Sequence, residues 1–413
     1  MFVHPELGYF DEREDLTAST LYAASRLAFG RARQLPPVAF RSKVFADLED
    51  EKIWTRAWIY LGGLDQIPDA GDLLPYTVGN HGIHVQRRPD GGLIGRFNKA
   101  QHGGCRAVPL QCQTGIKTKC SFTSCGHSRD RDVITASELG EETPAMRQYL
   151  GEQPDRLLPV RVECFGPFVH VNLDRSAEGL DDQLGPIEGL LAPYVEAKAK
   201  GVAGFWIEHK CNWKLAGKAF LDHAVAPKAA APAIQAKARR RRDGSAANEG
   251  VGHTLRTIAL TKEFESDLPE VATLDEPAHG EARFAWAFPN LLVAALPDHL
   301  VTIGLQPTSF SSTLYRVRLY VSAGAKRVGA DHPAVVKRLD FWREVLTRCG
   351  ERAAAEQREA ERWGTPSWPE TDGKKRPIET SEHGYWLQRY LVDRLLAAHD
   401  YHWAGPMTDA RIR

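Results

Sequence analysis

Six cysteine and histidine residues crowd into one short segment of the chain, and both side-chain types bind metal ions. They are His102, Cys105, Cys112, Cys120, Cys125 and His127. The chain has seven cysteines, an odd number, which in a reducing compartment favours metal chemistry over a set of disulfides. More than four soft donors suffice for a tetrahedral zinc ion or a rearranged iron–sulfur cluster. The alternative is that these cysteines are small, partly buried side chains without a metal.

Length and charge limit the functions this chain can have. Its 413 residues are enough for two domains, because single cores seldom grow far beyond about 250 residues. Lys plus Arg and Asp plus Glu both number 53, so no nucleic acid or anionic membrane partner is expected. No apolar run approaches the roughly 20 residues that cross a bilayer, and the first residues lack a signal-peptide pattern, so the expected location is the cytoplasm. A Gly-rich phosphate loop and a Gly-x-Ser-x-Gly motif are both missing, which argues against nucleotide binding and serine hydrolysis.

Three regions are expected to position the candidate residues. Residues 1–40 read as a helical arm. Residues 41–175 show short strands between turn signals, which indicate a small antiparallel β domain. Residues 176–413 combine long strands with helices expected over 180–198, 333–361 and 385–399, which indicates an α+β layer domain. Within this third region an alanine- and proline-rich stretch leads into the four arginines 239–242, and adjacent like charges are typical of a solvated loop.

Seven segments together follow one known pattern in order and spacing. They are 35–40, 53–62, 66–72, 160–174, 211–216, 288–292 and 382–387. In these segments the chain resembles the alpha subunits of Rieske nonhaem iron ring-hydroxylating oxygenases, and the likeness runs over most of its length. The resemblance implies an α+β fold with a small antiparallel Rieske-like domain and a helix-grip catalytic-type domain, in which long helices cover an antiparallel sheet. It also implies two cofactors, a [2Fe-2S] cluster and a mononuclear Fe(II) ion.

The resemblance assigns the cluster to the pattern Cys-x-His followed by Cys-x-x-His. On this chain the pattern keeps His102 and Cys120 but places Ala100 and Thr123 at the other cysteine and the other histidine. Each iron of such a cluster needs two terminal ligands besides the bridging sulfides. The ordinary cluster is therefore expected to be absent or altered, and zinc held by the remaining donors of the segment is the alternative.

For the mononuclear iron the resemblance implies two histidines and one carboxylate. The two histidine positions fall on Val225 and Ala230, and the carboxylate position falls on Cys349. All three iron positions have therefore lost their ligands. Asp222 keeps the acid that, in this family, links the cluster of one subunit to the iron of its neighbour.

A shifted frame gives a weaker iron site. Using His223 brings only one histidine, since Pro227 and Pro232 limit how a helix could supply another. Adding Asp340 gives two protein donors at best, which is weak for iron. The simpler interpretation of His223 is an ordinary histidine on a helix face.

The leading hypothesis is a noncatalytic alpha-like subunit that is inactive by itself. It would join a catalytic alpha subunit in a trimer-based hetero-oligomer, support hydroxylation of an aromatic or polycyclic substrate, and dock a reductase or ferredoxin. Positions that support the fold are kept while metal ligands are lost, which favours this hypothesis. One alternative is a catalytic Rieske-type oxygenase with unusual ligands from the cysteine segment. Another is a protein that binds a hydrophobic small molecule in an apolar pocket.

Overall fold

The structure, a computed structural model, describes residues 2–4, 9–11, 14–97, 159–224, 253–260, 262, 264, 267–323, 328–362 and 379–397. The chain divides into two units. Unit 1 is Met1–Ile53 with Asp181–Ala398, and unit 2 is Trp54–Leu180 with His399–Arg413. The limits 1–40, 41–175 and 176–413, drawn from the sequence, stay a prediction of domain organisation.

Among the described residues, unit 2 contains a six-stranded antiparallel sheet in the order β3-β8-β7-β6-β5-β4. Its strands are β3 (Ile59–Gly63), β4 (Leu73–Val78), β5 (His81–Arg87), β6 (Leu93–Phe97), β7 (Pro159–Phe165) and β8 (Phe168–Asn172), with the short helix η4 (Leu64–Gln66) after β3. The turn between β5 and β6 needs glycine, because Gly91 has a φ of 80°. Beside it the Asp90 carboxylate accepts a hydrogen bond from the Gly92 amide at 2.9 Å. A local polar turn thus fixes the hairpin that the sequence predicts.

Two histidines lie in the interior of unit 2. His84 on β5 is 0% exposed, and His170 on β8 is 2% exposed. Burial lowers the pKa of His84 to about 3, and the nearby Arg96 acts in the same direction. Burial also lowers the pKa of His170 to about 4, against a hydrogen bond with the Phe168 carbonyl at 3.2 Å. Both rings are therefore neutral in the folded chain at ordinary pH.

We expect the stability of the chain to fall as the pH drops from about 6.5 towards 4. The unfolded chain takes up a proton at each of these histidines near pH 6.5, about the usual histidine pKa, whereas the folded chain stays neutral there. Each histidine contributes a slope of up to about 1.4 kcal/mol per pH unit in that window. Urea denaturation between pH 7 and pH 4.5 measures the slope. A double variant, His84→Leu with His170→Phe, should flatten it, and an unchanged slope would contradict the assignment.

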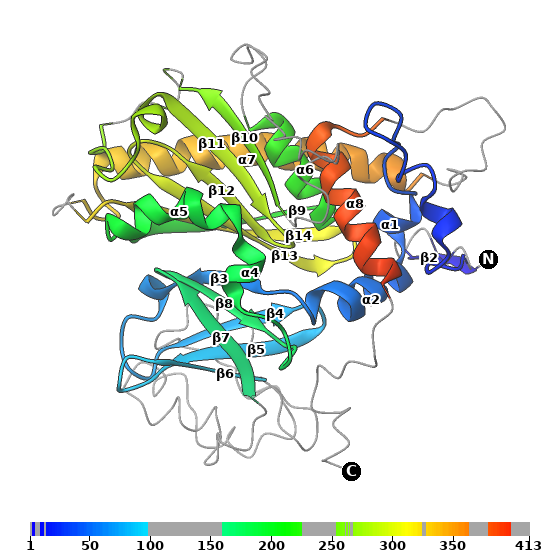
Figure 1. Ribbon diagram of the computed structural model, residues 1–413, viewed down its shortest axis with the longest axis horizontal. Coiled ribbons are helices and arrows are strands. Elements are labelled where there is room, and N and C mark those ends of the chain that lie inside the picture. The colour runs from blue at the N-terminus through cyan, green and yellow to red at the C-terminus, as the bar shows by residue number, and fades with distance from the viewer. Residues whose placement is uncertain are drawn as a thin grey trace, which may run out of the picture. The chain divides into compact units, whose positions relative to one another are not determined.

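The described part of unit 1 is built on a second six-stranded antiparallel sheet, in the order β10-β11-β12-β13-β14-β9 (Figure 1). Its strands are β9 (Lys200–His209), β10 (His253–Ala259), β11 (Glu281–Ala287), β12 (Leu291–Ala295), β13 (Leu300–Ser309) and β14 (Ser312–Val321). The central strand β12 is buried along its whole length, which explains its uninterrupted apolar sequence. β9 is the edge strand opposite β10. It pairs with β14, so the first and the last strand in chain order are neighbours in the sheet.

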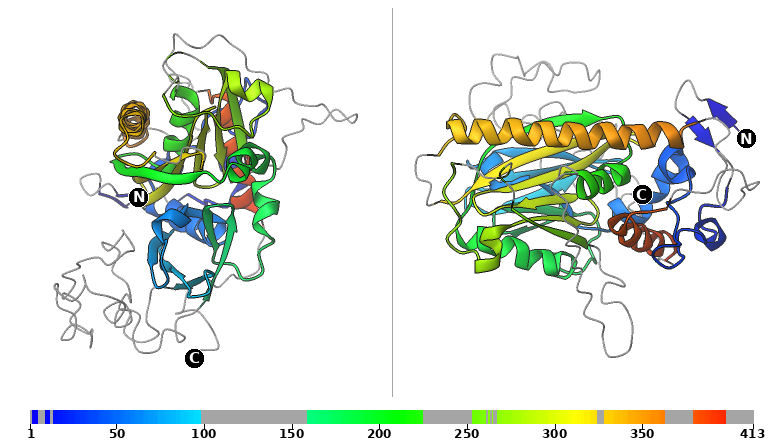
Figure 2. Two further views of the ribbon diagram at one scale, coloured as in Figure 1. Left: turned by 90° about the vertical axis from the view of Figure 1, so that its left-hand side faces the viewer. Right: turned by 90° about the horizontal axis from the view of Figure 1, so that it is seen from above.

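Helix α7 (Pro333–Ala360) runs along one face of this sheet (Figure 2). Its buried residues Val335, Trp342, Leu346 and Cys349 recur at helical spacing, as a helix lying on a sheet requires. The Trp342 ring nitrogen lies 2.9 Å from His299 Nε2, and His299 Nδ1 lies 2.7 Å from an Asp298 carboxylate oxygen. This polar chain ties the middle of α7 to the sheet.

The remaining elements of the described chain are shorter. In unit 1, α6 (Trp213–His223) packs against α7, while α8 (Glu382–Leu396) contacts both α6 and β10. The others are β1 (Phe2–His4), β2 (Tyr9–Asp11), η2 (Ser19–Tyr22), α1 (Val38–Arg41), α2 (Lys43–Glu49), η3 (Asp50–Trp54), α4 (Leu180–Leu184), α5 (Pro186–Glu196) and η9 (Glu276–Gly280).

Two helical predictions need correction. The expected N-terminal arm is not a continuous helix, since residues 14–37 hold only the single turn η2 among bends and turns. Further along the expected arm Gly30 has a φ of 84°, which does not continue a right-handed helix. The expected helix at 180–198 is broken into α4 and α5 at Gly185, whose φ of 47° does not continue a right-handed helix.

The α+β class predicted from the sequence is confirmed, with helices on an antiparallel sheet in unit 1 and a small antiparallel sheet in unit 2. Across the described residues, no helix is both long enough and apolar enough to span a bilayer.

Candidate functional site

The segment Asn212-Trp-Lys begins helix α6 and fixes its position. The Asn212 side-chain oxygen accepts from the Lys214 amide at 3.1 Å, which satisfies one of the free donors at the helix start. The Asn212 side-chain amide donates to the Phe310 carbonyl at 2.7 Å, which holds the helix start against the β13–β14 turn. The Trp213 ring packs edge-on against Trp286 of β11 at 6.1 Å. These residues therefore set where α6 carries its later side chains.

Lys214 is almost completely buried and is held by Glu49 of α2. The Lys214 ammonium lies 2.6 Å from Glu49 Oε1, and their side chains are 2% and 3% exposed. The Trp213 ring N–H donates to Glu49 Oε2 at 3.1 Å. Burial raises the pKa of Glu49 and lowers that of Lys214, while their mutual attraction opposes both shifts. Glu49 was not singled out from the sequence, because nothing local indicates a partner so far along the chain.

Asp222 lies on the last turn of α6 among positive groups. Its carboxylate is 3.7 Å from the Lys218 ammonium, and both side chains are 13% exposed. Lys218 also contacts both carboxylate oxygens of Glu356 on α7, at 3.1 and 3.2 Å. Arg256 of β10 donates to the backbone carbonyls of Leu221 and Asp222 at 2.6 and 3.2 Å. The acid that the sequence singled out is thus compensated by cations of the same chain.

His383 on α8 is a member of this cluster that sequence reasoning missed. Burial lowers its pKa, the nearby Asp222 raises it, and Arg256 lowers it. The segment 382–387 had contributed to the resemblance, but no chemistry was assigned to this histidine. The neighbouring His223 likewise has a pKa lowered mainly by burial, with Asp222 opposing.

Cys349, at the position expected for the iron carboxylate, is a buried thiol on the sheet-facing side of α7. It is 0% exposed, and burial raises its pKa to about 12, although Arg348 and Arg352 oppose this. Asp222 is near enough to raise it further, so the two positions do share one region. At this position the chain therefore offers a buried thiol in place of a carboxylate.

Buried groups also surround Cys349 in the sheet. Cys211, at the start of α6, has a pKa raised to about 12 by burial. Tyr315 of β14 lies beside both thiols, and its ring stacks edge-on with His209 at 4.9 Å. Of the described charged groups, Arg348, Arg352 and Asp222 are the ones that act on Cys349.

Asp340, the carboxylate of the shifted frame, is not brought into this cluster. Asp340 is exposed on α7, nine residues or about 13.5 Å along the helix from Cys349. It therefore does not join His223 in a shifted site. Val225 and Ala230 lie outside the described residues, just after the end of α6.

The candidate cluster residues of the Rieske-like domain also lie outside the described residues, so their assignment stays a prediction. They are Ala100, His102, Cys105, Cys112, Cys120, Thr123, Cys125 and His127.

The residues described here do not fit a mononuclear iron. Within the described ranges, no three His, Cys, Asp or Glu side chains gather as a group that could hold a metal ion. The two candidate donors that do lie in one region are the Cys349 thiol and the Asp222 carboxylate, which is paired with Lys218. An iron site of this family needs two histidines and a carboxylate.

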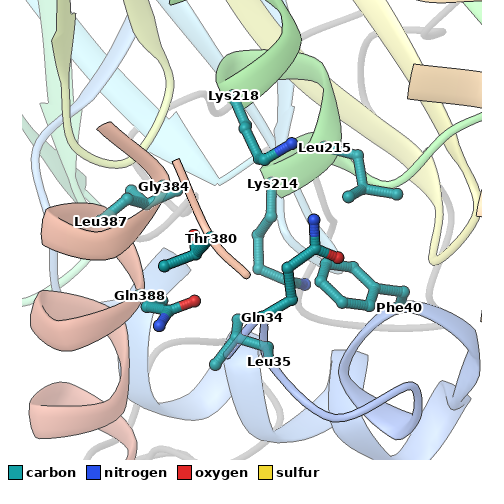
Figure 3. A pocket seen from close by; sticks show the side chains of 10 residues that line it. All are labelled: Gln34, Leu35, Phe40, Lys214, Leu215, Lys218, Thr380, Gly384, Leu387 and Gln388. Atoms are coloured by element: carbon teal, nitrogen blue, oxygen red, sulfur yellow. The ribbon is translucent and has the colours of Figure 1, made fainter. Parts of the chain in front are cut away.

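A small cavity lies between α6, α8 and the N-terminal segment of unit 1 (Figure 3). Lys214 and Lys218 reach into it from α6, while Leu387 and Gln388 of α8 and Phe40 of α1 form other walls. Its volume is about 20 Å³, which holds a water molecule but no aromatic ligand. This cavity therefore does not suit a hydrophobic small molecule.

Residues 197–357 match the family model described as "Ring hydroxylating alpha subunit (catalytic domain)". This segment is thus similar to the catalytic domain of ring-hydroxylating alpha subunits. The match includes the sheet of unit 1, α6 and most of α7, and hence Asp222, Arg256 and Cys349. The resemblance stated from the sequence is confirmed, and His383 lies beyond the matched alpha-subunit segment.

Curated alpha subunits share about a quarter of their residues with this chain where they match. Biphenyl 2,3-dioxygenase subunit alpha of Rhodococcus jostii is 25% identical over 195 residues, which are 46% of this chain and 41% of the relative. The glycine betaine monooxygenase oxygenase subunit of Chromohalobacter salexigens is 29% identical over 174 residues, 42% of this chain and 37% of the relative. The chain thus spans about two fifths of the length of these relatives.

Solved alpha-subunit structures share the fold over nearly the whole chain. A quaternary ammonium Rieske monooxygenase in complex with gamma-butyrobetaine has a TM-score of 0.58 at 17% identity, covering 92% of this chain and 99% of its own. A naphthalene 1,2-dioxygenase variant bound to phenanthrene has a TM-score of 0.58 at 14% identity, covering 92% and 95%. At these identities the comparison establishes the Rieske oxygenase alpha-subunit fold, as the sequence predicts.

Proposed function

We propose that this chain is a noncatalytic alpha-like subunit, which assembles with a catalytic alpha subunit and supports hydroxylation by that partner. The observation that carries the proposal is the pair of groups facing the region between α6 and α7. Cys349 presents a buried thiol where the resemblance places a carboxylate ligand, and Asp222 is paired with Lys218. Buried apolar side chains nevertheless surround this region. We infer that the chain keeps the shape of the domain rather than its iron chemistry.

In this role the residues of the chain position elements and do not react. Contacts of Glu49 with Trp213 and Lys214 hold the start of α6 in place. At its other end Arg256 donates to a backbone carbonyl of the last turn. An intact α6 and α7 would present to a catalytic neighbour the same outer surfaces that an active alpha subunit presents. The partner would supply the iron, the oxygen chemistry and the substrate pocket, and a reductase or ferredoxin would supply its electrons.

Co-expression with a catalytic alpha subunit from the same organism, one with an intact ligand set, tests the proposal. We expect a hetero-oligomer by light scattering and a several-fold rise in hydroxylated product over either chain alone. Both an aromatic and a quaternary ammonium substrate should be offered, since relatives carry names of both kinds. As a control, a partner whose own iron ligands are replaced should form the complex but yield no product. A partner that assembles and works fully without this chain would remove the proposal.

The second candidate is a catalytic Rieske-type oxygenase that recruits ligands from the segment 102–127. The six cysteine and histidine donors of that segment are what favour it. Visible and electron paramagnetic resonance spectra of anaerobically purified protein separate the two functions, because a cluster with histidine ligands has a distinct signal.

A further inference from the structure

Two cations of this chain meet at the end of helix α6. Arg256 donates to the carbonyls of Leu221 and Asp222, two of the groups that a helix end leaves without amide partners. These carbonyls carry partial negative charge, which a guanidinium compensates. Lys218, one turn before Asp222, lies between the carboxylates of Asp222 and Glu356. The α6 terminus is therefore neutralised from β10 and from α6 itself.

The charges of the cluster balance without any metal. Lys218 lies within ion-pair distance of both Asp222 and Glu356, and Arg256 donates to the carbonyls at the end of α6. Arg352 adds further positive potential, which acts on His223 and Cys349. A divalent cation placed here would bring two charges to a cluster in which both described carboxylates are already paired with Lys218.

We propose that Lys218 and Arg256 replace a metal ion in this domain, since they supply the positive charge that Asp222 and the end of α6 require and they repel divalent cations. This inference rests on the proposed noncatalytic role and explains how the domain keeps its shape in that role. Lys218 and Arg256 are positioning residues, which act through the helix and through Asp222. The alternative is a simple helix cap, in which Arg256 binds the carbonyls and the charge of Asp222 does not affect stability.

Thermal unfolding in the presence of a chelator tests the stabilising half of the proposal. Arg256→Met and Lys218→Met should each lower the melting temperature by about 2–4 °C, whereas the chelator alone should leave the unmodified chain unchanged. Asp222→Asn should lower the melting temperature of the unmodified chain. In the Lys218→Met background the same change should raise the melting temperature, because there the Asp222 carboxylate lacks its cation. A helix cap alone predicts the same Asp222→Asn effect in both backgrounds, and that result would overturn the inference.

Arg283→Met is the matched control. Arg283 lies on the adjacent strand β11 opposite Thr257, and its side chain is 23% exposed beside Glu281 and Asp275. Its loss removes an ion pair near solvent and should lower the melting temperature by less than about 2 °C. An Arg256→Met effect no larger than this control would also overturn the inference.

Cobalt(II) binding tests the repulsion half. The three predicted iron positions are refilled by Val225→His, Ala230→His and Cys349→Asp, with and without Lys218→Met and Arg256→Met. We expect Co(II), followed by its visible absorption, to bind about 10-fold or more tightly when the cations are absent. Equal affinity in the two proteins, including no binding in either, would contradict repulsion. Iron in the unmodified chain would instead contradict the proposed function, so the two failures are distinguishable.

Discussion

Replacing Glu49 with alanine should lower the free energy of unfolding by about 3–5 kcal/mol, the largest effect expected of any single change. The substitution leaves the Lys214 ammonium without a counterion at a site that is 2% exposed. It also removes the oxygen that accepts from the Trp213 ring at 3.1 Å. A buried charge without compensation costs far more than the pair contributes. Urea denaturation followed by tryptophan fluorescence measures the change.

Two controls separate burial from charge. Asp47→Ala on the same helix removes the partner of Lys43 in a pair at 2.7 Å that is 49% and 56% exposed, and should cost less than about 1 kcal/mol. Replacing both buried partners, Glu49→Leu with Lys214→Met, should recover most of the loss, since well-packed apolar groups often substitute for a buried ion pair. If Glu49→Ala costs no more than Asp47→Ala, α6 is not anchored in this way.

Gly217→Ala should cost about 2 kcal/mol or more, although alanine is normally the better helix residue. A Cβ atom at this position would overlap the ring of Trp286. That ring cannot move aside, because its N–H donates to the Pro289 carbonyl at 2.9 Å and it packs edge-on against Trp213. The change therefore pushes α6 away from the sheet, and chemical denaturation measures the cost.

Gly189→Ala is the matched control for the glycine effect. Gly189 lies in helix α5, and a Cβ atom there meets no atom within 4 Å. Alanine should therefore stabilise the chain by up to about 1 kcal/mol. Opposite signs at the two glycines are the expected result, and a neutral Gly217→Ala would mean that α6 does not lie this close to β11.

Local sequence signals predicted the strands and long helices well. Alternating side chains and the turns at Asp90 and Gly166 were enough for unit 2, and helical spacing was enough for α7. The prediction of a continuous N-terminal helix was wrong, because apolar spacing alone did not show that only the single turn η2 forms there. The prediction of one continuous helix over 180–198 was wrong, because the break depends on the φ value of a single residue, Gly185.

The candidate site was predicted only in part, because its members come from distant segments. Asp222 and Cys349 were named from the resemblance, and the structure places them in one region. Glu49, Arg256 and His383 were missed, since their roles depend on contacts across 164 residues or across separate elements. The sequence does not show that Lys214 is buried, so its requirement for a carboxylate partner became visible only in the structure.

Metal analysis of the purified chain tests the central claim most directly. Iron, zinc and acid-labile sulfide are measured together after anaerobic purification and again after reconstitution with Fe(II) and sulfide. The noncatalytic account predicts iron and sulfide far below one per chain in both samples, with no Rieske-type paramagnetic signal. A full [2Fe-2S] cluster together with one mononuclear iron per chain would contradict it.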